Sequence, residues 1–479
     1  MKRVDVDIAI IGAGSAGMTA YRAAVAHTDS VLVIESGEYG TTCARVGCMP
    51  SKLLIAAADA AHAVSQAGLF GVEVDGTRVD GKAVMQRVRD ERDRFVGFVV
   101  GAVEKWPDRH KLRGRARFVA PNVLRVDDDT EVHARRIVIA TGSSPVLPPG
   151  WRDSLGDRLI VNDDVFSWQD LPRSVAVTGG GVIGLELSQA LSRLGVKVRL
   201  LGRNGRIGPL TDPAVVGEAR AIFTESMQFA PETTQVQAKR EGNGVLVTFT
   251  ENGVEQAEHV DYMLVAAGRR ANLHDLELQH AGLGLDEVGI PRVDRQTGRI
   301  GDSPVFMAGD AGTATPLLHE ATDEGYLAGD NAGRYPHVQP HPRRAPLGIV
   351  FTDPQIAIVG VGHAALVEQG VRFETGTVNF NDQGRSRVMA QNRGLLAVYG
   401  EVGTGRFLGA EMIGPAAEHI GHLLAWALQQ HQTVVQMLAC PFYHPTVEEG
   451  LRTALRDLEQ RLRPAMSMPD DCMDCTPGT

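Results

Sequence analysis

Two segments of the chain share one pattern, an apolar strand followed by a glycine-rich turn and a helix. Residues 7–11 lead into Gly12-Ala-Gly-Ser-Ala-Gly17, and residues 174–178 lead into Gly179-Gly-Gly-Val-Ile-Gly184. This pattern is typical of the first strand and helix of a Rossmann domain, where the glycines admit a pyrophosphate to the helix N-terminus. The two copies lie too far apart for a solenoid repeat. They therefore predict two related nucleotide-binding domains in an α/β protein.

Length, composition and charge bound the class of protein. At about 100–200 residues per domain, the 479 residues predict roughly three domains. With 43% hydrophobic and 22% charged residues, the composition is that of a globular protein. The net charge of −10 argues against nucleic acid as a partner. No stretch approaches the ~18 consecutive apolar residues of a membrane span, and the N-terminus lacks a signal-peptide pattern. We therefore expect a cytoplasmic protein without a membrane partner.

The first glycine turn has an acidic residue at the position that a dinucleotide site requires. Glu35 ends the next apolar run, residues 31–35, where a ribose-binding acid is expected. Gly12, Gly14 and Gly17 are the candidate pyrophosphate-binding positions, and the Glu35 carboxylate can accept hydrogen bonds from ribose hydroxyls. The alternative is a tight turn beside an exposed acid. The strand, the turn and the acid in register favour a nucleotide site.

The second glycine turn, with Gly179, Gly181 and Gly184, lacks that acid. The position equivalent to Glu35 is Gly202, and Arg203 and Arg206 follow it. A guanidinium pairs with a 2′-phosphate, whereas a carboxylate would repel it. The alternative is that both arginines are solvated loop charges. We predict that this domain binds NADPH or NADH, with NADPH favoured.

The placement of two of the five cysteines points to redox chemistry. Cys43 and Cys48 lie in the stretch, residues 43–52, that leads into an alanine-rich segment expected to form a helix over residues 53–64. Residues five apart on an ideal helix have Cα atoms roughly 8–9 Å apart, which exceeds the ~7 Å limit for a disulfide. A bridge therefore requires a distorted first turn, which Gly47 favours. A helix N-terminus is expected to lower the thiol pKa. A metal site is not predicted, because further Cys or His ligands are lacking nearby.

With these motifs in this order, the chain resembles the pyridine nucleotide–disulfide oxidoreductases over residues 4–462. The first glycine turn with Glu35 is similar to the FAD fingerprint of that family, and Cys43 and Cys48 match its redox-active pair. Further motifs match in family order: Ala140-Thr141-Gly142-Ser143, which returns from the FAD domain; residues 266–272 around Gly268; and residues 305–310, whose aspartate Asp310 bonds the ribityl chain of FAD in the family.

The resemblance also implies an acid–base pair and further cofactor contacts. His444 and Glu449 match the family dyad, in which an imidazole moves protons near pH 7 and a carboxylate fixes its tautomer. Without the family pattern, His444 before a helix would more often be a capping feature. Glu448 is the alternative carboxylate, but the family spacing selects Glu449. The remaining residues that match cofactor-binding positions are Thr42, Lys52 and Glu186.

The fold class implied by these motifs is α/β, with two Rossmann-like nucleotide-binding domains for FAD and NAD(P) and an α+β C-terminal dimerisation domain. The resemblance implies a homodimer in which each active site is shared across subunits. The domain boundaries we expect are residues 1–150 for the first part of the FAD domain with the redox disulfide, 151–272 for the NAD(P) domain, 273–344 for the FAD return segment, 345–463 for the interface domain and 464–479 for a flexible tail.

The function implied by the resemblance is electron transfer between NAD(P)(H) and a small or protein-bound disulfide or dithiol. We favour a dihydrolipoamide dehydrogenase-like activity, because Val182 replaces the tyrosine that gates the nicotinamide pocket in glutathione reductase. One alternative is an NADPH-dependent reductase of another disulfide or of a soft metal such as Hg(II). An alternative of another class is a flavin-bearing redox sensor. Cys472 and Cys475, in the tail, are either incidental or relay electrons or metal to a bulky acceptor.

Overall fold

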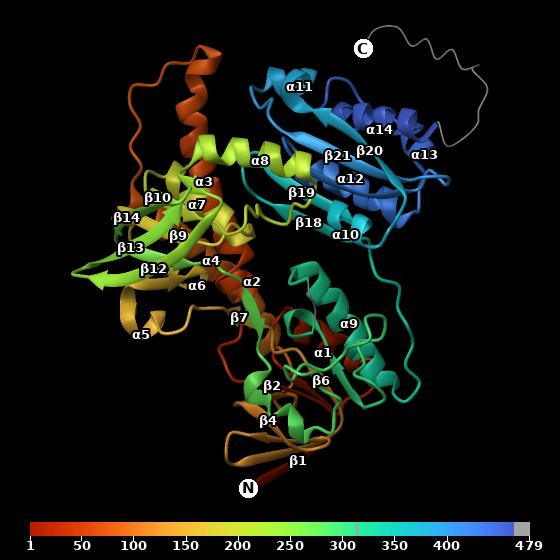
Figure 1. Cartoon of the computed structure of the whole chain (residues 1–479). Helices are drawn as coiled ribbons and strands as arrows, with labels where there is room; N and C mark the ends of the chain where they lie inside the picture. Colours follow the sequence, from red (N-terminus) through yellow and green to blue (C-terminus); the bar gives the residue numbers. More distant parts are fainter. Residues whose placement is uncertain (313–314, 464–479) are drawn as a thin grey trace. The chain divides into compact units, whose positions relative to one another are not determined.

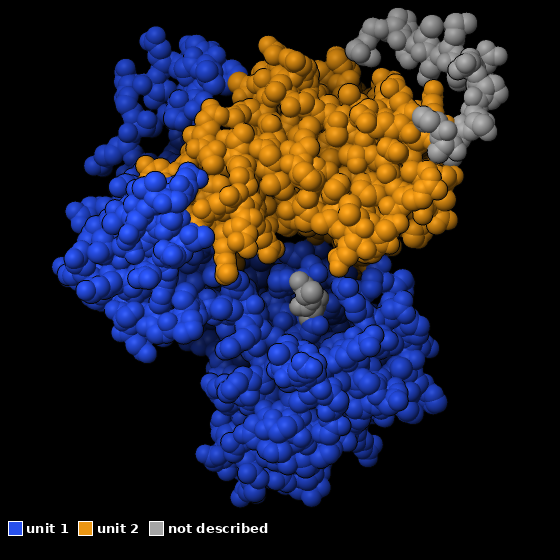
Figure 2. Space-filling view, in the orientation of Figure 1, with its two compact units in different colours: residues 1–179, 190–198, 234–343 blue, residues 180–189, 199–233, 344–479 orange. Residues whose placement is uncertain are grey.

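The computed structural model of the chain describes residues 1–312 and 315–463. These residues divide into two compact units, distinguished in Figure 2. Unit 1 contains residues 1–179, 190–198 and 234–343, and unit 2 contains residues 180–189, 199–233 and 344–463 of the described chain. Part of the expected NAD(P) domain is thereby grouped with the C-terminal segment. The domain boundaries expected from the sequence stay predictions.

The main sheet of unit 1 forms from the apolar strands expected around the first glycine turn. Its strands are β1 (Lys2–Ile11), β2 (Val31–Glu35), β3 (Lys111–Arg113), β4 (Ala116–Ala120), β5 (Val123–Val126), β6 (Thr130–Ile139) and β17 (Val305–Met307). The strand order is β3-β2-β1-β6-β5-β4, and β17 pairs with β6. β1, β2, β3, β6 and β17 pair in parallel, whereas β4 and β5 extend the sheet by antiparallel pairing. The parallel centre confirms the expected α/β class.

Two helices pack with unusually close backbones beside this sheet. They are α1 (Ser15–Ala24) and α9 (Leu318–Arg334), which lie side by side in unit 1 (Figure 1). A Cβ added at Gly325 would lie 2.2 Å from the carbonyl oxygen of Ala16, and one added at Gly329 would lie 2.2 Å from that of Ala20. Only glycine permits this approach, because any side chain would overlap the facing backbone.

The other helices of unit 1 include the pair that carries the cysteines. The α-helices are α2 (Thr42–Arg45), α3 (Cys48–Gln66), α4 (Gly81–Glu104), α5 (Trp151–Leu155) and α6 (Asn162–Val165). The short 3₁₀ helices are η1 (Ala67–Phe70), η2 (Asp108–His110), η3 (Gly156–Arg158), η4 (His274–Leu276), η5 (Leu278–His280) and η6 (Gly309–Ala311). The helix expected around residues 53–64 therefore begins earlier, at Cys48, and is preceded by a separate short helix.

Further strands of unit 1 follow the first sheet along the chain. They are β7 (Ser143–Pro145), β8 (Leu159–Val161), β9 (Ser174–Thr178), β12 (Thr233–Glu241), β13 (Gly244–Glu251), β14 (Val254–Val260), β15 (Tyr262–Val265) and β16 (Arg269–Ala271). β15 lies between β8 and β9 with parallel pairing, as expected for a second nucleotide-binding fold. β7 and β16 form an antiparallel pair.

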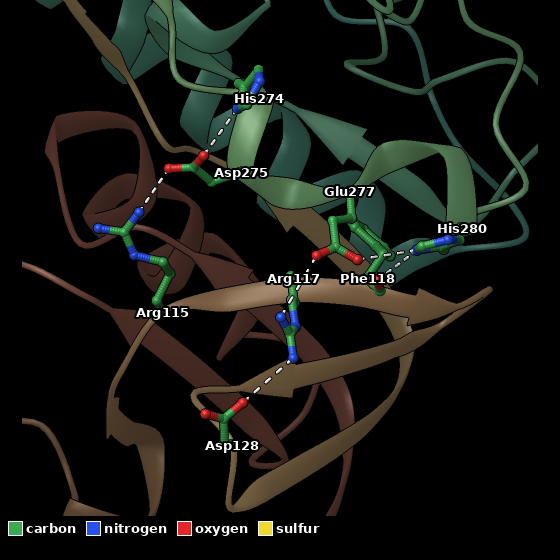
Figure 3. Close-up of polar contacts among 8 residues, drawn as sticks. All are labelled: Arg115, Arg117, Phe118, Asp128, His274, Asp275, Glu277 and His280. Carbon is green, nitrogen blue, oxygen red and sulfur yellow. Dashed lines mark hydrogen bonds and ion pairs between the residues drawn. The ribbon is translucent and has the colours of Figure 1, made fainter.

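Polar contacts join the segment after β16 to the edge of the first sheet (Figure 3). Arg115 pairs with Asp275 at 2.7 Å, and Arg117 pairs with Glu277 at 3.6 Å. His280 Nδ1 lies 3.3 Å from the carbonyl oxygen of Phe118 on β4. These pairs are exposed, so each contributes little free energy by itself. They show that the chain returns to the first sheet directly after residue 272.

Unit 2 is built on an antiparallel sheet with helices packed against it. Its strands are β11 (Phe229–Ala230), β18 (Leu347–Val350), β19 (Gln355–Gly360), β20 (Phe373–Asn379), β21 (Leu395–Glu401) and β22 (Phe407–Gly414), and β10 (Lys197–Leu201) ends in this unit. The last five strands in chain order form the sheet β18-β19-β22-β21-β20. The helices are α8 (Pro213–Ser226), α10 (His363–Glu368), α11 (Gly384–Val388), α12 (Ala417–Gln429), α13 (Val434–Leu438) and α14 (Glu449–Leu462), with η7 (Phe380–Asp382); α7 (Val182–Arg193) begins here.

A buried carboxylate ties α8 to this sheet within unit 2. Glu411 on β22 is 1% exposed and accepts hydrogen bonds from the backbone N–H groups of Thr211, Asp212 and His363 at 2.5, 3.0 and 2.8 Å. The hydroxyl of Tyr399 donates to Asp212, which caps α8. A buried charge of this kind is tolerated because its oxygens are satisfied by donors.

One helical segment among the described residues, Thr42–Phe70, is long and apolar enough by composition to cross a membrane. The sequence predicted no membrane span, because no stretch approaches ~18 consecutive apolar residues. The same segment contains both members of the cysteine pair, Cys43 and Cys48. The absence of a membrane partner stays a prediction.

We predict that Gly329→Ala lowers the midpoint of thermal unfolding. The added methyl group would lie 2.2 Å from the Ala20 carbonyl oxygen, and overpacking of this kind costs about 1–3 kcal/mol. The matched control is Gly101→Ala on α4, where an added Cβ meets nothing within 4 Å. That control should leave the midpoint unchanged or raise it, because alanine favours helix. Equal midpoints for the two variants would contradict the packing argument.

Candidate functional site

Three different features of the structure explain why glycine occupies positions 12, 14 and 17 of the first turn. Gly12 has a φ of +106°, and a Cβ there would lie 2.4 Å from the carbonyl oxygen of Ala140. A Cβ at Gly17 would lie 1.9 Å from the carbonyl oxygen of Gly12. A Cβ at Gly14 would meet nothing within 4 Å, so open space lies beside the N-terminus of α1. This geometry is what a pyrophosphate requires.

Glu35 lies beside this turn, as the sequence predicts. Its Oε2 accepts a hydrogen bond from the backbone N–H of Ala13 at 2.7 Å, and its Oε1 accepts one from Gly37 at 2.8 Å. Both contacts orient the carboxylate at the end of β2. Because each carboxylate oxygen has a second lone pair, it can still accept from a ribose hydroxyl.

The two later FAD motifs meet within unit 1. The hydroxyl of Ser143 donates to Asp310 Oδ2 at 2.7 Å, which joins the return segment to the second motif. The Asn272 side chain donates to the carbonyl oxygen of Thr141 at 3.0 Å, and Gly142 adopts a φ of +69°. Thr141 Oγ1 is buried without a hydrogen-bond partner among the described residues. A bound cofactor could supply the hydrogen-bond partner that the Thr141 hydroxyl lacks. The residues present therefore fit FAD.

The cysteine pair lies across a break between two helices. Cys43 is in α2, and Cys48 is the first residue of α3. Gly47 separates them with φ −124° and ψ −119°, and a Cβ at Gly47 would lie 3.0 Å from the Thr42 carbonyl oxygen. The distorted turn expected from the sequence is therefore present. Thr42 itself is exposed at the start of α2, and Lys52 is half-buried one turn after Cys48.

The two thiols interact directly and are not joined in a disulfide. A hydrogen bond with the Cys48 side chain, together with burial, raises the pKa of the Cys43 thiol above its usual value. The backbone N–H groups of Cys48 and Met49 act in the opposite direction without outweighing these causes. The helix N-terminus therefore acts on the Cys43 pKa in the expected direction, but the expected net lowering is not found in the dithiol pair. The physical reason is that the neighbouring thiol stabilises the protonated form.

The second glycine turn matches the first at its first two glycines. Gly179 has a φ of +116°, and a Cβ there would lie 2.3 Å from the carbonyl oxygen of Ala266. A Cβ at Gly181 would meet nothing within 4 Å. Gly184 lies in the first turn of α7, and Gly268 has a φ of +118° in the turn after β15. These features match a dinucleotide turn, although the nucleotide contacts stay predictions.

Packing explains why no acid follows β10. A Cβ at Gly202 would lie 2.8 Å from the carbonyl oxygen of Pro231, so no side chain fits there. Arg203 is exposed, and no ion pair holds it among the described residues. Arg206 is also exposed, and its Nε donates to the carbonyl oxygen of Gly208 at 3.3 Å. Both arginines are therefore exposed in the segment that follows β10, and their contact with a phosphate stays a prediction.

The predicted acid–base pair forms within unit 2. His444 Nδ1 lies 3.1 Å from both carboxylate oxygens of Glu449, and the backbone N–H of Thr446 donates to the same carboxylate at 3.1 Å. Burial alone would raise the pKa of Glu449, but the hydrogen bonds from His444 and Thr446 outweigh it and lower that pKa. Glu448 is instead the residue before α14, so the choice of Glu449 over Glu448 agrees with this geometry.

The imidazole of His444 is exposed, and an apolar cavity lies beside this loop in unit 2. Its volume is about 510 Å³, and Trp426 and Tyr443, which line it, are 67% and 81% exposed. Large exposed aromatic side chains of this kind mark surfaces that another molecule covers. Elsewhere in unit 2, Glu186 is buried on α7 and accepts a hydrogen bond from the Phe351 backbone at 2.9 Å. The cofactor contacts expected for Lys52 and Glu186 stay predictions.

Comparison with known proteins agrees with this site. The family model for "Pyridine nucleotide-disulphide oxidoreductase" matches residues 6–325, and the model for its dimerisation domain matches residues 347–455. Over 467 residues the chain is 32% identical to a mercuric reductase of Streptomyces lividans, covering 94% of this chain and 95% of the relative. Over 465 residues it is 30% identical to a dihydrolipoyl dehydrogenase of Haloferax volcanii, covering 94% of this chain and 95% of the relative.

Solved structures share the fold. The structure of LpdA from Mycobacterium tuberculosis superposes with a TM-score of 0.80 at 23% identity, covering 95% of this chain and 99% of that chain. The flavoprotein disulfide reductase RclA from Escherichia coli superposes with a TM-score of 0.77 at 23% identity, covering 95% of this chain and 99% of that chain. At this identity the likeness concerns the fold alone.

The fold and the site define an α/β flavoprotein. It has two nucleotide-binding domains, a pair of neighbouring cysteine thiols and a C-terminal dimerisation domain. The chain belongs to the pyridine nucleotide-disulphide oxidoreductase family. It is therefore an enzyme of a class that uses FAD and a pyridine nucleotide. The comparisons thus confirm the family and the enzyme class expected from the sequence motifs.

Sequence reasoning missed several polar residues around the cysteines and Asp310. Arg269 and Ser143 lay inside quoted motifs but were not assigned to the site, and both contact it. Asn162 also contacts the segment between the cysteines. Asn162 gave no sequence signal, because nothing near it in the sequence indicates a contact with the distant residue Val46. Cys472 and Cys475 lie outside the described residues.

Proposed function

We propose that this enzyme transfers electrons between NAD(P)(H) and a dithiol or disulfide substrate, in the manner of a dihydrolipoyl dehydrogenase. The observation that carries the proposal is the helix break at Gly47, which brings Cys43 and Cys48 into hydrogen-bond contact. The relatives named dihydrolipoyl dehydrogenase support this substrate class. The relatives named mercuric reductase support a second candidate, an NADPH-dependent reductase of Hg(II) or of another disulfide.

The chemistry assigned to the thiols is a balanced exchange. The Cys43 thiolate attacks one sulfur of the substrate disulfide and releases the other as a thiol. Cys48 then attacks Cys43, which releases the second substrate thiol and leaves a Cys43–Cys48 disulfide. Bound FAD would supply the two-electron chemistry that links this disulfide to the nicotinamide, and the residues around Gly12, Glu35 and Asp310 would hold it. The reverse sequence oxidises a dithiol, so the physiological direction is not part of the proposal.

His444 is assigned the proton transfer. Its Nδ1 contacts Glu449, which leaves Nε2 to hold or return the proton of a thiol. The dimerisation domain supports a homodimer. In that dimer, the partner subunit's His444 serves the Cys43–Cys48 pair of this chain. The exposed Trp426 and Tyr443 suit a surface that the second copy covers.

The remaining assignments concern the nucleotide, the compartment and the tail. Arg203 and Arg206 favour NADPH over NADH, and the protein is proposed to act in the cytoplasm without nucleic acid or a membrane. An efficient enzyme is favoured over a redox sensor, because a sensor would not need the contact between His444 and Glu449. The relay by Cys472 and Cys475 stays a minority hypothesis beside an incidental pair of cysteines.

We predict that dihydrolipoamide and lipoamide are the preferred substrate pair. The test measures kcat/KM for lipoamide, glutathione disulfide, thioredoxin and Hg(II), each with NADH and with NADPH. Lipoamide should give the highest value if this enzyme acts as its dihydrolipoyl dehydrogenase relatives are named. A higher value with Hg(II) or glutathione disulfide would instead select the second candidate.

We predict that Cys43→Ser abolishes turnover of the disulfide substrate but leaves reduction of the bound flavin by NADPH. The reason is that Cys43 alone is assigned the exchange with substrate. Flavin reduction is followed by stopped-flow absorbance and substrate turnover by steady-state assay. The matched control is Cys440→Ser, which alters another thiol in unit 2 and should preserve both rates. Preserved turnover in Cys43→Ser would overturn the assignment.

We predict that Arg203→Ala raises KM for NADPH about tenfold more than KM for NADH, because a charge-assisted hydrogen bond is worth about 1.5–3 kcal/mol. The control is Arg387→Ala, an exposed arginine of the same unit that pairs with Asp382. That control should change neither KM. An equal increase for both nucleotides in Arg203→Ala would mean that this residue does not contact the 2′-phosphate.

A further inference from the structure

The peptide between the two cysteines is held by a side chain from a distant part of unit 1. Asn162 Nδ2 donates a hydrogen bond to the carbonyl oxygen of Val46 at 3.1 Å. Asn162 is 6% exposed and begins α6, directly after β8. Val46 directly follows α2 and directly precedes Gly47. The contact therefore lies at the helix break that brings Cys43 and Cys48 together.

The chain geometry explains why this carbonyl needs a partner. The last carbonyl groups of a helix accept no hydrogen bond from within that helix. The helix α2 ends at Arg45, so the Val46 carbonyl lies just beyond its end. Because α3 begins only at Cys48, the Val46 carbonyl does not take part in the hydrogen bonds of either helix. Val46 is half-buried, and its carbonyl oxygen accepts the hydrogen bond from Asn162 in place of a helical partner. The same hydrogen bond fixes the orientation of the peptide that joins the helices.

Both N–H donors of the Asn162 amide are used. The first donates to Val46, and Asp163 Oδ1 accepts the second at 2.8 Å. Both partners are acceptors, so the NH₂ end of the amide must face them. An Asp at position 162 would have the same shape but would offer no donor to either partner. The substitution Asn162→Asp therefore removes both hydrogen bonds while it keeps the shape of the side chain.

The contacts continue from Asp163 to the flavin-binding motif. Arg269 Nη1 lies 3.9 Å from Asp163 Oδ1, and Arg269 Nε donates to the hydroxyl of Ser143 at 2.9 Å. That hydroxyl donates in turn to Asp310 Oδ2 at 2.7 Å. Arg269 and Asp163 are only 15% and 36% exposed in their side chains, so the chain of contacts is partly shielded from water.

We propose that Asn162 is a positioning residue for the redox pair, holding the intercysteine peptide so that Cys43 and Cys48 stay within bonding distance. Asp163, Arg269 and Ser143 connect this contact to Asp310, so that the thiol pair and the flavin-binding carboxylate are held by one polar network. The inference rests on the proposed redox role of Cys43 and Cys48. Its physical consequence is a higher effective concentration of one thiol at the other.

The test measures the equilibrium between the dithiol and the disulfide in the Asn162→Ala holoenzyme. The protein is equilibrated with mixtures of reduced and oxidised dithiothreitol, quenched in acid and alkylated. Mass spectrometry then gives the fraction of the Cys43–Cys48 disulfide. We expect the equilibrium constant for disulfide formation to fall about fivefold, as expected for a lost hydrogen bond of about 1 kcal/mol. Asn162→Asp should give at least the same fall, and it carries the comparison if the alanine variant does not fold.

The matched control is Asn331→Ala. Asn331 is fully buried in unit 1, and its Nδ2 likewise donates to two backbone carbonyls, those of Thr297 and Gln339, at 3.1 and 2.9 Å. Its loss should lower thermal stability but leave the thiol equilibrium unchanged. An equal shift in Asn331→Ala would overturn the proposal, because general destabilisation would then explain the effect.

Two further outcomes separate this inference from the proposed function. If both Asn162 variants stay within twofold of the wild-type equilibrium while Cys43→Ser still abolishes disulfide turnover, the positioning role is overturned and the redox function stands. If Cys43→Ser retains turnover, the redox function is overturned, and the positioning role is overturned with it.

Discussion

The close approach of backbones around α1 is the constraint on which the first nucleotide site depends. Gly12 and Gly17 let the strand, the turn and the helix meet at distances that no side chain permits. Gly325 and Gly329 let α9 lie equally close to the other side of α1. Because glycine has no side chain, these four residues allow both the binding of a nucleotide and the close packing of the domain.

The pair of reactive thiols depends on the break between α2 and α3. A continuous helix through Cys43 and Cys48 would hold the two sulfur atoms apart. The break at Gly47 brings them into contact, and two side chains hold the segment around it. Arg45 bonds the carbonyl oxygen of Tyr39 through Nε at 2.9 Å, and Asn162 bonds that of Val46. The segment between the cysteines is therefore held by hydrogen bonds to residues outside it, Tyr39 and Asn162.

The acid–base pair illustrates a different principle, in which a short sequence spacing suffices. His444 and Glu449 lie close in the sequence and meet because α14 begins at Glu449. The turn before the helix directs the imidazole to the carboxylate. The pKa of that carboxyl is lowered by its donors in spite of burial, so Glu449 is charged at neutral pH and orients His444. Local geometry of this kind is within reach of sequence reasoning.

The sequence by itself determined the family, both glycine turns, Glu35 and the cysteine pair, because each depends on residues a few positions apart. It also predicted the break at Gly47 from the length of a helical turn. The tertiary structure decided what depends on distant segments. The raised pKa of Cys43 needed the orientation of the two thiols, and the exclusion of any side chain at Gly202 needed the position of Pro231. The contact of Asn162 with Val46 had no sequence signal, because folding alone brings together residues separated by more than a hundred positions.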